Sequence, residues 1–587
     1  MGGLRPPTPA CARTGNTAEA AFRLTLDVVL GVDVAAGEPL DDGEVTERFA
    51  PAVFPPVTAL APMTPLPFRR DAMREALAAT DTFDVAIIGG GATGLGCAVD
   101  AAARGYRTAL VERGDFGEGT SSRSTKLVHG GVRYLARGDV RLVREALRER
   151  GRLLANAPHI AHTRAFAVPA YSWWEKPYYG AGLFAYDRLA LSLGIGRTEL
   201  LSEDEYVERV PTARRDGLDG GVLYYDGQFD DARLALALAR TAADLGAVVL
   251  NHTACVGLDK TDGGVDGVVV RDAEDGSETV VAARVVVNAT GVWADEVRRL
   301  DRPAAAPMLE PSRGAHVVLD RAFLPGETAV MVPKTDDGRV LFAIPWLGKT
   351  VIGTTDVPVE APSPEPRPDA DEVDYILEHA GRYLDPAPTR ADVRAVWAGL
   401  RPLISDPDAE GTAALSREHV VSVSASGLVT VTGGKWTTYR VMAEDAIDHA
   451  AETAGLDAHH SDTADLRLHG WLPEALYDAA DPFAAYGADA AALRALVDED
   501  ASLGEPVHER LPSVTGAEIV WAAREEQART AADALARRTR GLFLDADASA
   551  EAAPRVAALV ARETGRDAAW EAGQVQAVRE VARGEAV

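Results

Sequence analysis

The chain has 587 residues, of which 47% are apolar and 25% charged, and its formal net charge is −29. This length exceeds one ordinary hydrophobic core, so we expect two or three domains, and the negative charge argues against broad affinity for nucleic acid or anionic membranes. No apolar run reaches the ~18–20 residues that span a bilayer, and no secretory signal is evident. Three scattered cysteines predict neither a disulfide framework nor a metal cluster. We therefore expect a cytoplasmic protein that holds no metal.

Residues 1–80 differ in composition from the rest of the chain. The stretch 51–69 carries many prolines and no helical or strand period, which is typical of an extended linker. We expect an N-terminal extension without regular structure over 1–80, and we hypothesise that residues 1–70 are dispensable. Loss of the cofactor and of activity in a chain starting near Asp71 would contradict that hypothesis.

A dinucleotide-binding pattern follows this extension. An apolar run at 85–88 predicts a buried parallel strand, and Gly89-x-Gly91-x-x-Gly94 then leads into a helix predicted over 94–104. The glycines permit a tight turn, close approach of the backbone to a pyrophosphate, and packing of the helix on the strand. A second strand at 108–111 ends at Glu112, near the spacing expected for a carboxylate that binds ribose hydroxyls. The pattern predicts a bound dinucleotide and does not distinguish FAD from NAD.

Two stretches of unusual composition come next. The loop at 119–135 is dense in hydroxyls and glycines, which can bind a phosphate or the edge of an isoalloxazine ring. After a helix predicted over 140–155, residues 172–189 include six aromatic side chains. Two interpretations of this aromatic run are open: a buried cap over an active site, or a surface that lies at lipid headgroups. Core packing is the commoner use of such residues.

The second half of the chain also contains segments suited to contact a cofactor. A helix is predicted over 230–246, and a strand at 284–288 runs into Ala289-Thr290-Gly291, small residues suited to a chain that passes close to a cofactor. Residues 307–431 alternate as in an antiparallel sheet. The stretch 433–440 opens another helix at a glycine junction suited to a phosphate or a flavin oxygen. From about residue 470 helical periods predict a separate all-α module.

Several segments carry a resemblance to a known family. In chain order they are SSRSTKLVHGGVRYL (121–135), FDDARL (229–234), NATGVWAD (288–295), RGAHVVL (313–319), IGTTD (352–356), GLRPL (399–403), SREH (416–419) and TGGKWTTYR (432–440). This set, spread over about residues 82–445, resembles the FAD-dependent glycerol-3-phosphate dehydrogenases. The helical tail, including ALARRTRGLFLD (534–545), is similar to the family's C-terminal cap domain.

The resemblance implies an α/β fold with three parts. These are a Rossmann-type FAD-binding domain of the D-amino-acid-oxidase/glutathione-reductase-like class, an antiparallel-sheet substrate domain and a C-terminal all-α cap domain. The corresponding division is an extension at 1–80, an FAD-dependent oxidoreductase region at 81–455 and a helical domain at 456–587. Within the central region we expect FAD-binding segments at about 81–170, 220–305 and 415–455, and a substrate domain at about 171–219 and 306–414.

The implied reaction is oxidation of sn-glycerol 3-phosphate at C2 to dihydroxyacetone phosphate, with electrons passed from FAD to a membrane quinone. Three alternatives stay open: an oxidase that reduces oxygen to hydrogen peroxide, a flavin enzyme of the D-amino-acid-oxidase type that acts on an amine, and a flavin-binding protein without turnover. The resemblance also implies a homodimer with weak peripheral attachment to the cytoplasmic face of the inner membrane. Candidates for the attachment surface are the aromatic run at 173–186 and the basic run at 537–540.

The substrate is a phosphomonoester dianion, so a protein with a net charge of −29 needs converging cations to bind it. By resemblance these are Arg133, Arg401, Arg417 and Lys435, with Tyr134 beside them. The base that removes the C2 hydroxyl proton is His316 or His129, with His316 slightly favoured, and Arg401 can stabilise the developing alkoxide. Residues expected to contact FAD are Gly89, Gly91, Gly94, Glu112, Thr120, Ser121, Ser122, Ser124, Lys126, His129, Gly130, Ala289, Thr290, Gly291, Gly434, Lys435 and Thr437.

Overall fold

The computed structural model describes residues 64–132, 139–190, 194–333, 335–336, 338–405, 418–473, 476–478 and 480–586. The predicted substrate residues Arg133, Tyr134 and Arg417 lie outside these ranges, as does most of the expected N-terminal extension. Within the described part of the chain, no helix combines the length and apolar composition that a membrane span requires.

The first sheet is built around the predicted dinucleotide-binding strand. Its order is β17-β18-β10-β1-β2-β7, with β8 and β9 attached to β10. Strand β1 pairs in parallel with β2 and β10 on either side, so its apolar run is buried on both faces. The strand bounds are β1 Phe83–Ile88, β2 Thr108–Val111, β7 Val248–Leu250, β8 Thr253–Thr261, β9 Gly264–Asp272, β10 Glu278–Asn288, β17 His419–Val423 and β18 Val429–Gly433.

Three helices cover this first sheet. Helix α3 (Ala92–Ala103), whose residues are nearly all small or apolar, packs against α11 (Tyr439–Ala454) and α8 (Asp231–Asp244). The predicted strand–glycine–helix–strand unit is therefore confirmed. Shorter helices border the sheet: η1 Thr120–Ser122, η3 Gly291–Trp293, α9 Ala294–Asp301, η6 Trp436–Thr438 and η7 Thr463–Asp465.

The second sheet has ten strands, in the order β15-β11-β14-β13-β12-β4-β6-β3, with β16 paired to β11 and β5 to β6. Strands β4 and β6, which the sequence analysis placed in FAD-binding segments, belong to this sheet. A strand's sheet is decided by its distant partners, which local composition does not reveal. The bounds are β3 Leu127–Val128, β4 Ala161–Ala170, β5 Glu199–Leu201, β6 Gly220–Phe229, β11 Leu309–Asp320, β12 Ala329–Val332, β13 Leu341–Trp346, β14 Lys349–Gly353, β15 Val357–Pro358 and β16 Val393–Ile404.

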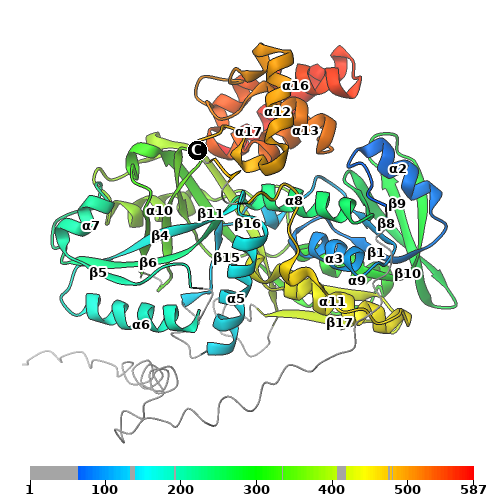
Figure 1. The fold of residues 1–587 in the computed structure, drawn as a ribbon, viewed down its shortest axis with the longest axis horizontal. Helices are drawn as coiled ribbons and strands as arrows, with labels where there is room; N and C mark the ends of the chain where they lie inside the picture. Colours follow the sequence, from blue (N-terminus) through cyan, green and yellow to red (C-terminus); the bar gives the residue numbers. More distant parts are fainter. Residues whose placement is uncertain are drawn as a thin grey trace, which may run out of the picture.

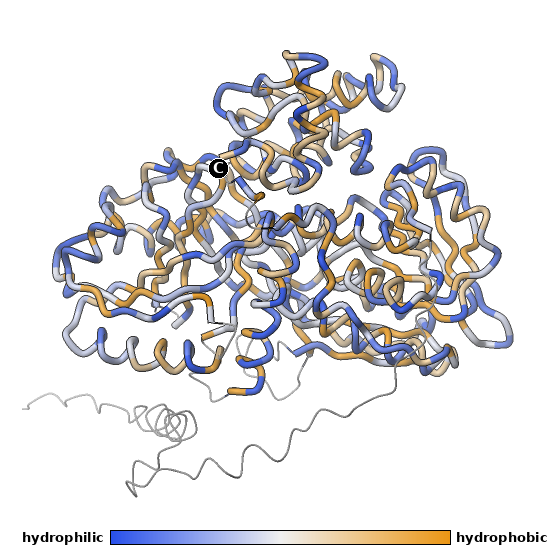
Figure 2. The backbone as a smooth tube through the Cα atoms, in the orientation of Figure 1, coloured by the Kyte–Doolittle hydropathy of each residue, from blue (hydrophilic) through white to orange (hydrophobic). Residues whose placement is uncertain are grey.

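Helices flank this sheet on its outer sides, as Figure 1 shows for α6, α7 and α10. Hydrophobic residues follow the strands of both sheets, and hydrophilic residues concentrate in loops and outer helices (Figure 2). The helix bounds are α5 Val140–Asn156, α6 Glu175–Leu189, α7 Glu203–Arg209, η4 Arg321–Phe323, α10 Ala370–Gly381 and η5 Arg390–Asp392.

Regular structure begins earlier than expected at the N-terminal side. Helix α2 (Arg70–Ala79) buries Met73 completely, and Phe68 before it is only 6% exposed. The Arg70 guanidinium donates to Asp272 Oδ2 over 2.8 Å. The expectation of an unstructured extension is therefore wrong for residues 64–80, because the apolar face of this short helix packs against β7. A chain starting near Asp71 would lose Phe68 and Arg70 from the core.

The C-terminal helices form a separate layer above the two sheets (Figure 1). Their apolar residues join those of the second sheet in one continuous core, in which Phe543 packs edge-on against Trp397 at a centroid distance of 5.2 Å. The bounds are η9 Ala484–Asp489, α12 Ala490–Glu499, η10 Ala501–Gly504, α13 Gly516–Glu525, α14 Ala531–Asp533, a π-helical turn η11 Ala534–Arg538, α15 Gly541–Leu544, α16 Ala546–Thr564 and α17 Ala568–Glu585.

Candidate active site

A cavity of about 630 Å³ lies at the carboxyl ends of β1, β2 and β10, where a doubly wound sheet binds its ligand. It contains the larger part of the predicted cofactor set. The predicted residues that line it are Gly89, Gly91, Glu112, Thr120, Ser121, Ala289, Thr290, Gly291, Gly434 and Lys435.

The fingerprint glycines are required by close packing here. Gly89 has φ +112°, and a Cβ added to it would lie 2.7 Å from the Ala289 carbonyl oxygen. A Cβ at Gly94 would lie 1.9 Å from the Gly89 oxygen, so the third glycine lets α3 pack on the turn without itself lining the cavity. Helix α3 thus directs its N-terminal amides at the cavity, where they favour a pyrophosphate.

Glu112 is held in place by the backbone. Its two carboxylate oxygens accept hydrogen bonds from Gly90 N over 2.6 Å and Gly114 N over 2.8 Å. Burial raises the pKa of this carboxyl group, against these two hydrogen bonds. The carboxylate lines the cavity beside the glycine turn, so its position fits recognition of a ribose hydroxyl. The glycine turn, the helix terminus and the acid together fit the AMP half of a dinucleotide.

A second cavity of about 290 Å³ adjoins the first and shares Lys435 and Trp436 with it. Its walls come from β11, β12, β13 and β16 of the second sheet, from residues 354–356 after β14, and from the loop at 123–132. The predicted residues that line it are Thr120, Ser124, His129, His316, Arg401, Gly434, Lys435 and Thr437. Both candidate bases and two of the predicted cations therefore meet in one place.

His316 lies on β11 and is 2% exposed. Its ring stacks on Trp397 of the neighbouring strand, with ring centroids 5.2 Å apart, and Nε2 lies 2.9 Å from Thr125 Oγ1. Nδ1 has no hydrogen-bond partner among the described residues. Burial, and then the positive charges of Lys126 and Arg401, hold the pKa of His316 well below its ordinary value. The imidazole is therefore neutral at physiological pH, which is the form a general base needs.

Arg401 lies on β16, with its side chain 23% exposed. Its guanidinium donates to the Thr355 carbonyl over 2.9 Å and to Thr354 Oγ1 over 3.1 Å, and lies 3.2 Å from Asp356 Oδ1. These contacts fix the planar guanidinium at the cavity wall. A fixed cation of this kind suits a phosphate or a developing oxyanion.

Besides Gly94, three predicted cofactor residues line neither cavity: Ser122, Lys126 and Gly130. The Lys126 ammonium is fully buried and pairs with Asp231 Oδ2 over 2.7 Å, so it is directed into the protein core. The Gly130 amide donates to the Tyr186 hydroxyl, and a Cβ there would lie 2.5 Å from Leu147. These residues stabilise the loop that lines the cavities.

Several residues that line the cavities or support them were not among the predicted site residues. Trp436 borders both cavities and donates from Nε1 to the Ser121 carbonyl over 2.8 Å. Thr354 and Asp356 hold Arg401, and Arg123 lines the second cavity. All four belong to the segments that carried the family resemblance, which was the signal available for finding them. Their roles depend on contacts between segments.

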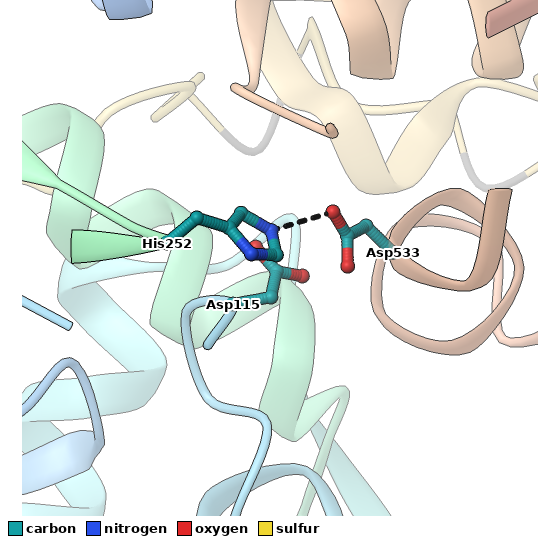
Figure 3. A group of neighbouring side chains, drawn as sticks. All are labelled: Asp115, His252 and Asp533. Atoms are coloured by element: carbon teal, nitrogen blue, oxygen red, sulfur yellow. Dashed lines mark hydrogen bonds and ion pairs between the residues drawn. The ribbon is translucent and has the colours of Figure 1, made fainter. Parts of the chain in front are cut away.

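Asp115, His252 and Asp533 form a separate cluster between the first sheet and the C-terminal domain (Figure 3). Their ligand atoms lie within 4.8 Å of one another, as in a metal site. Arg537 donates to Asp115 over 2.5 Å and to Asp533 over 2.6 Å, and Arg538 also donates to Asp115. Two guanidinium groups already neutralise the carboxylates and would repel a divalent cation. The cluster is an interdomain ion network.

This network overturns one candidate for membrane attachment. The side chains of Arg537, Arg538 and Arg540 are 6%, 2% and 1% exposed. The basic run at 537–540 therefore faces buried carboxylates of the sheet domains and is absent from the surface. Its sequence is typical of a basic surface patch, because the acids that bury it lie several hundred residues away.

Comparison with known proteins identifies the family. A family model described as an FAD dependent oxidoreductase matches residues 84–440, and one described as the C-terminal domain of alpha-glycerophosphate oxidase matches residues 441–571. The mitochondrial glycerol-3-phosphate dehydrogenase of Homo sapiens is 41% identical over 544 residues, which cover 86% of this chain and 74% of the human protein. The chain belongs to the FAD-dependent glycerol-3-phosphate dehydrogenase family.

Other members agree with this assignment. The mitochondrial glycerol-3-phosphate dehydrogenase of Arabidopsis thaliana is 41% identical over 547 residues, covering 86% of each chain. The structure of the glycerol-3-phosphate dehydrogenase from Bacillus halodurans complexed with FAD is 30% identical, has a TM-score of 0.73, and covers 89% of this chain and 99% of that one. These matches confirm the predicted family, fold class and FAD cofactor. In this chain the fingerprint glycines and Glu112 are the residues that would hold the AMP half of FAD.

Proposed function

We propose that this protein oxidises sn-glycerol 3-phosphate at C2 to dihydroxyacetone phosphate and passes the electrons to a membrane quinone. The observation that carries the proposal is the second cavity, where the buried neutral base His316 and the cations Arg401 and Lys435 meet beside the dinucleotide cavity. FAD, when bound, supplies the acceptor of the hydride from C2.

The cations of the second cavity give the site its affinity for a phosphomonoester. At a net charge of −29 the protein as a whole repels a dianion, so local cations must overcome that field. We assign the phosphate to Lys435 and Arg401, together with Arg133, Tyr134 and Arg417 as predicted from the sequence. The planar guanidinium groups can each donate to two phosphate oxygens. Arg401 also stabilises negative charge that develops on the C2 oxygen.

His316 is assigned as the general base. Its neutral imidazole accepts the proton of the C2 hydroxyl as the hydride leaves C2, and the resulting charge remains on the ring. His129 lines the same cavity, and its backbone N–H donates to Thr437 Oγ1 over 3.2 Å. That contact supports a role for His129 in positioning the loop beside the cofactor.

Anaerobic mixing with glycerol 3-phosphate tests the reaction. We expect the flavin absorbance of the purified holoenzyme to bleach, whereas glycerol, which lacks the phosphate, should leave it unchanged. Absence of bleaching would reject the reaction and favour a flavin-binding protein without turnover. Turnover of the same sample with a soluble quinone analogue and with oxygen then separates a dehydrogenase from an oxidase, and hydrogen peroxide as the main product would reject the quinone assignment.

We also propose peripheral membrane attachment through the aromatic run. Trp173 is 81% exposed, and Trp174, Tyr178 and Phe184 on or beside α6 are each about half exposed. Trp and Tyr favour the headgroup level of a bilayer, and several exposed aromatic side chains on one short segment suit an interaction surface. The protein should sediment with vesicles containing quinone, and a Trp173→Ser, Phe184→Ser double variant should stay in the supernatant. Localisation at the cytoplasmic face and a homodimeric state remain predictions of the family resemblance.

A further inference from the structure

Asp231, at the start of α8, is fully buried. Its carboxylate contacts the loop at 123–132, which lines the second cavity. Its Oδ2 accepts hydrogen bonds from Lys126 Nζ over 2.7 Å, Ser124 Oγ over 2.7 Å and Ser124 N over 3.1 Å. One carboxylate oxygen therefore binds two residues of the loop, on either side of Thr125. None of the roles assigned above to the cavity residues accounts for this arrangement.

Thr125 is the residue that the loop presents to His316. Its hydroxyl oxygen lies 2.9 Å from His316 Nε2. Lys126, the next residue, has φ +61°, a left-handed conformation that costs energy in a residue with a side chain and persists only where its surroundings hold it. The Lys126 ammonium is held by its ion pair with Asp231 and by a hydrogen bond of 2.8 Å to the Ser122 carbonyl. The position of the Thr125 hydroxyl thus depends on Asp231.

The third residue that contacts Asp231, after Ser124 and Lys126, is Arg540 of the C-terminal domain. Arg540 Nη2 donates to Asp231 Oδ1 over 3.1 Å and to the Ser122 carbonyl over 2.7 Å. The guanidinium is 1% exposed and lies over the Phe543 ring at 4.7 Å. Arg540 of the helical domain therefore donates hydrogen bonds both to Asp231 and to Ser122, a residue next to the loop that Asp231 contacts. In the core, a charge-assisted contact of this kind is well defined in geometry because its partners have no water to exchange with.

We propose that Thr125, Asp231 and Arg540 form a positioning relay that fixes the tautomer of His316. Thr125 Oγ1 accepts a hydrogen bond from Nε2–H, which leaves the lone pair on Nδ1, the nitrogen without a protein partner. In this tautomer Nδ1, which is enclosed by protein in this structure, is the basic nitrogen of the ring. The ring retains its Nε2 proton throughout, so Thr125 orients the base without exchanging a proton. This inference rests on the proposed function, because it requires His316 to act as the base.

Thr125→Val and Thr125→Ser form the decisive pair. Valine has nearly the shape of threonine but cannot accept a hydrogen bond, whereas serine retains the hydroxyl. We expect Thr125→Val to slow anaerobic flavin reduction by about 10- to 100-fold, a loss typical of removing a group that orients a functional histidine, with KM little changed. Thr125→Ser should stay within about threefold of the unmodified enzyme. Equal rates for valine and the unmodified enzyme would overturn the relay.

A readout independent of turnover accompanies the kinetics. In protein labelled with ¹⁵N at histidine, the resonances of the buried neutral imidazole report which nitrogen carries the proton. Thr125→Val should shift that tautomer population for one histidine, which His316→Gln identifies by the loss of its signals. An unchanged spectrum in Thr125→Val would overturn the proposal even where the rate falls. If the unmodified enzyme fails to bleach with glycerol 3-phosphate, the proposed function fails, and the tautomer measurement still tests the relay.

Arg233 provides a matched control for Arg540. Arg233 Nη1 donates to Glu526 over 2.8 Å across the same domain interface and makes no hydrogen bond to the loop in the described structure. Arg540→Gln and Arg233→Gln each remove a buried guanidinium paired with a carboxylate, so both should lower the thermal unfolding midpoint. Only Arg540→Gln should slow flavin reduction, by about tenfold. Equal slowing in both variants would mean that domain docking, and no specific contact to the loop, sets the rate.

Discussion

His316 is buried and His252 partly buried, and their surroundings have opposite effects on the pKa of the ring. His316 adjoins a cavity and has cations nearby, and burial together with those cations lowers its pKa. His252 Nε2 lies 2.9 Å from Asp533; burial alone would lower its pKa, but the carboxylates of Asp533 and Asp115 raise it. One imidazole is kept as a neutral base and the other is stabilised as a cation. The sign of the neighbouring charge therefore separates the proposed base from the histidine of the interdomain ion network.

The surroundings of His252 show what its charge stabilises. For Asp533 burial alone would raise the pKa, but His252 and then Arg537 and Arg538 outweigh it and hold the pKa well below its ordinary value. His252 pairs with Asp533 across the domain boundary (Figure 3), and Asp115 pairs across it with Arg537 and Arg538. The network joins the C-terminal domain to the first sheet, whereas the relay through Asp231 joins it to the active-site loop.

Replacement of each histidine by alanine should show the largest difference between the two residues, in the rate of flavin reduction. His316→Ala removes the proposed base, so anaerobic flavin reduction should slow by about 10²- to 10⁴-fold. His252→Ala removes a contact remote from the reacting atoms and should change that rate by less than about threefold. Rapid mixing of both variants with glycerol 3-phosphate, each with its FAD content measured, gives the result. A His316→Ala enzyme reduced at the unmodified rate would remove this residue from the role of base.

Asp115→Asn should give the largest loss of stability. Asp115 is fully buried against two guanidinium groups, and removal of one partner of a buried charge network costs about 3–5 kcal/mol. Denaturant unfolding should show an earlier transition of the C-terminal domain, which limited proteolysis would also detect. The exposed pair Arg382–Asp336 provides the control, because solvent screens it and its loss should barely move the transition. Equal effects of Asp115→Asn and Asp336→Asn would show that the interdomain network contributes little.

Arg401→Gln should affect substrate binding more than stability. The guanidinium is partly exposed and contacts residues 354–356 in the loop between β14 and β15, so the fold should tolerate its loss. Loss of a charge-assisted contact to phosphate, worth about 1.5–3 kcal/mol, predicts a KM higher by about 10- to 100-fold with FAD still bound. Arg401→Lys should recover only part of the affinity, because an ammonium lacks the planar fork. Unchanged steady-state kinetics in both variants would reject the phosphate assignment.

Sequence patterns predicted those parts of the fold that a single short segment determines. The turn at Gly89, helix α3 and Glu112 lie within 30 residues of one another, and each follows from steric or periodic constraints on that segment. Sheet membership was different. Strand β4 pairs with β6, 50 to 68 residues away along the chain, and with β12, and no local pattern distinguishes these partners from those of the first sheet.

The same distinction applies to two basic residues whose partners the sequence did not reveal. Lys126 stands in a loop of hydroxyls and glycines, where a lysine is typical of an anion site, yet the carboxylate that buries it lies 105 residues away. Arg537 belongs to a basic run typical of a surface, yet it pairs with Asp115 at a separation of 422 residues. Charge in a sequence predicts a ligand or solvent by default, and only the folded chain shows that another segment supplies the counter-charge.

The smallest expected effect is a difference in the pH dependence of stability. The pKa of His316 is lowered on folding, so its neutral form contributes stability that is complete above pH 6.5 and is lost as the pH falls, because the unfolded chain then takes up a proton that the folded chain does not. For His252 the pKa is raised, so its contribution is complete below pH 6.5 and is lost as the pH rises through the folded value.

Unfolding of the His316→Gln and His252→Gln variants at pH 5.5, 6.5 and 8 separates the two contributions. Between pH 6.5 and 5.5 the unmodified enzyme should lose about 1 kcal/mol relative to His316→Gln, whereas relative to His252→Gln it should lose stability between pH 6.5 and 8. Burial also lowers the pKa of His159, to about 4, but this group is present in every variant and cancels in the comparison. Slopes of the same sign for both variants would contradict the opposite pKa shifts of the two histidines, and with them the distinction between the active-site cavity and the interdomain network.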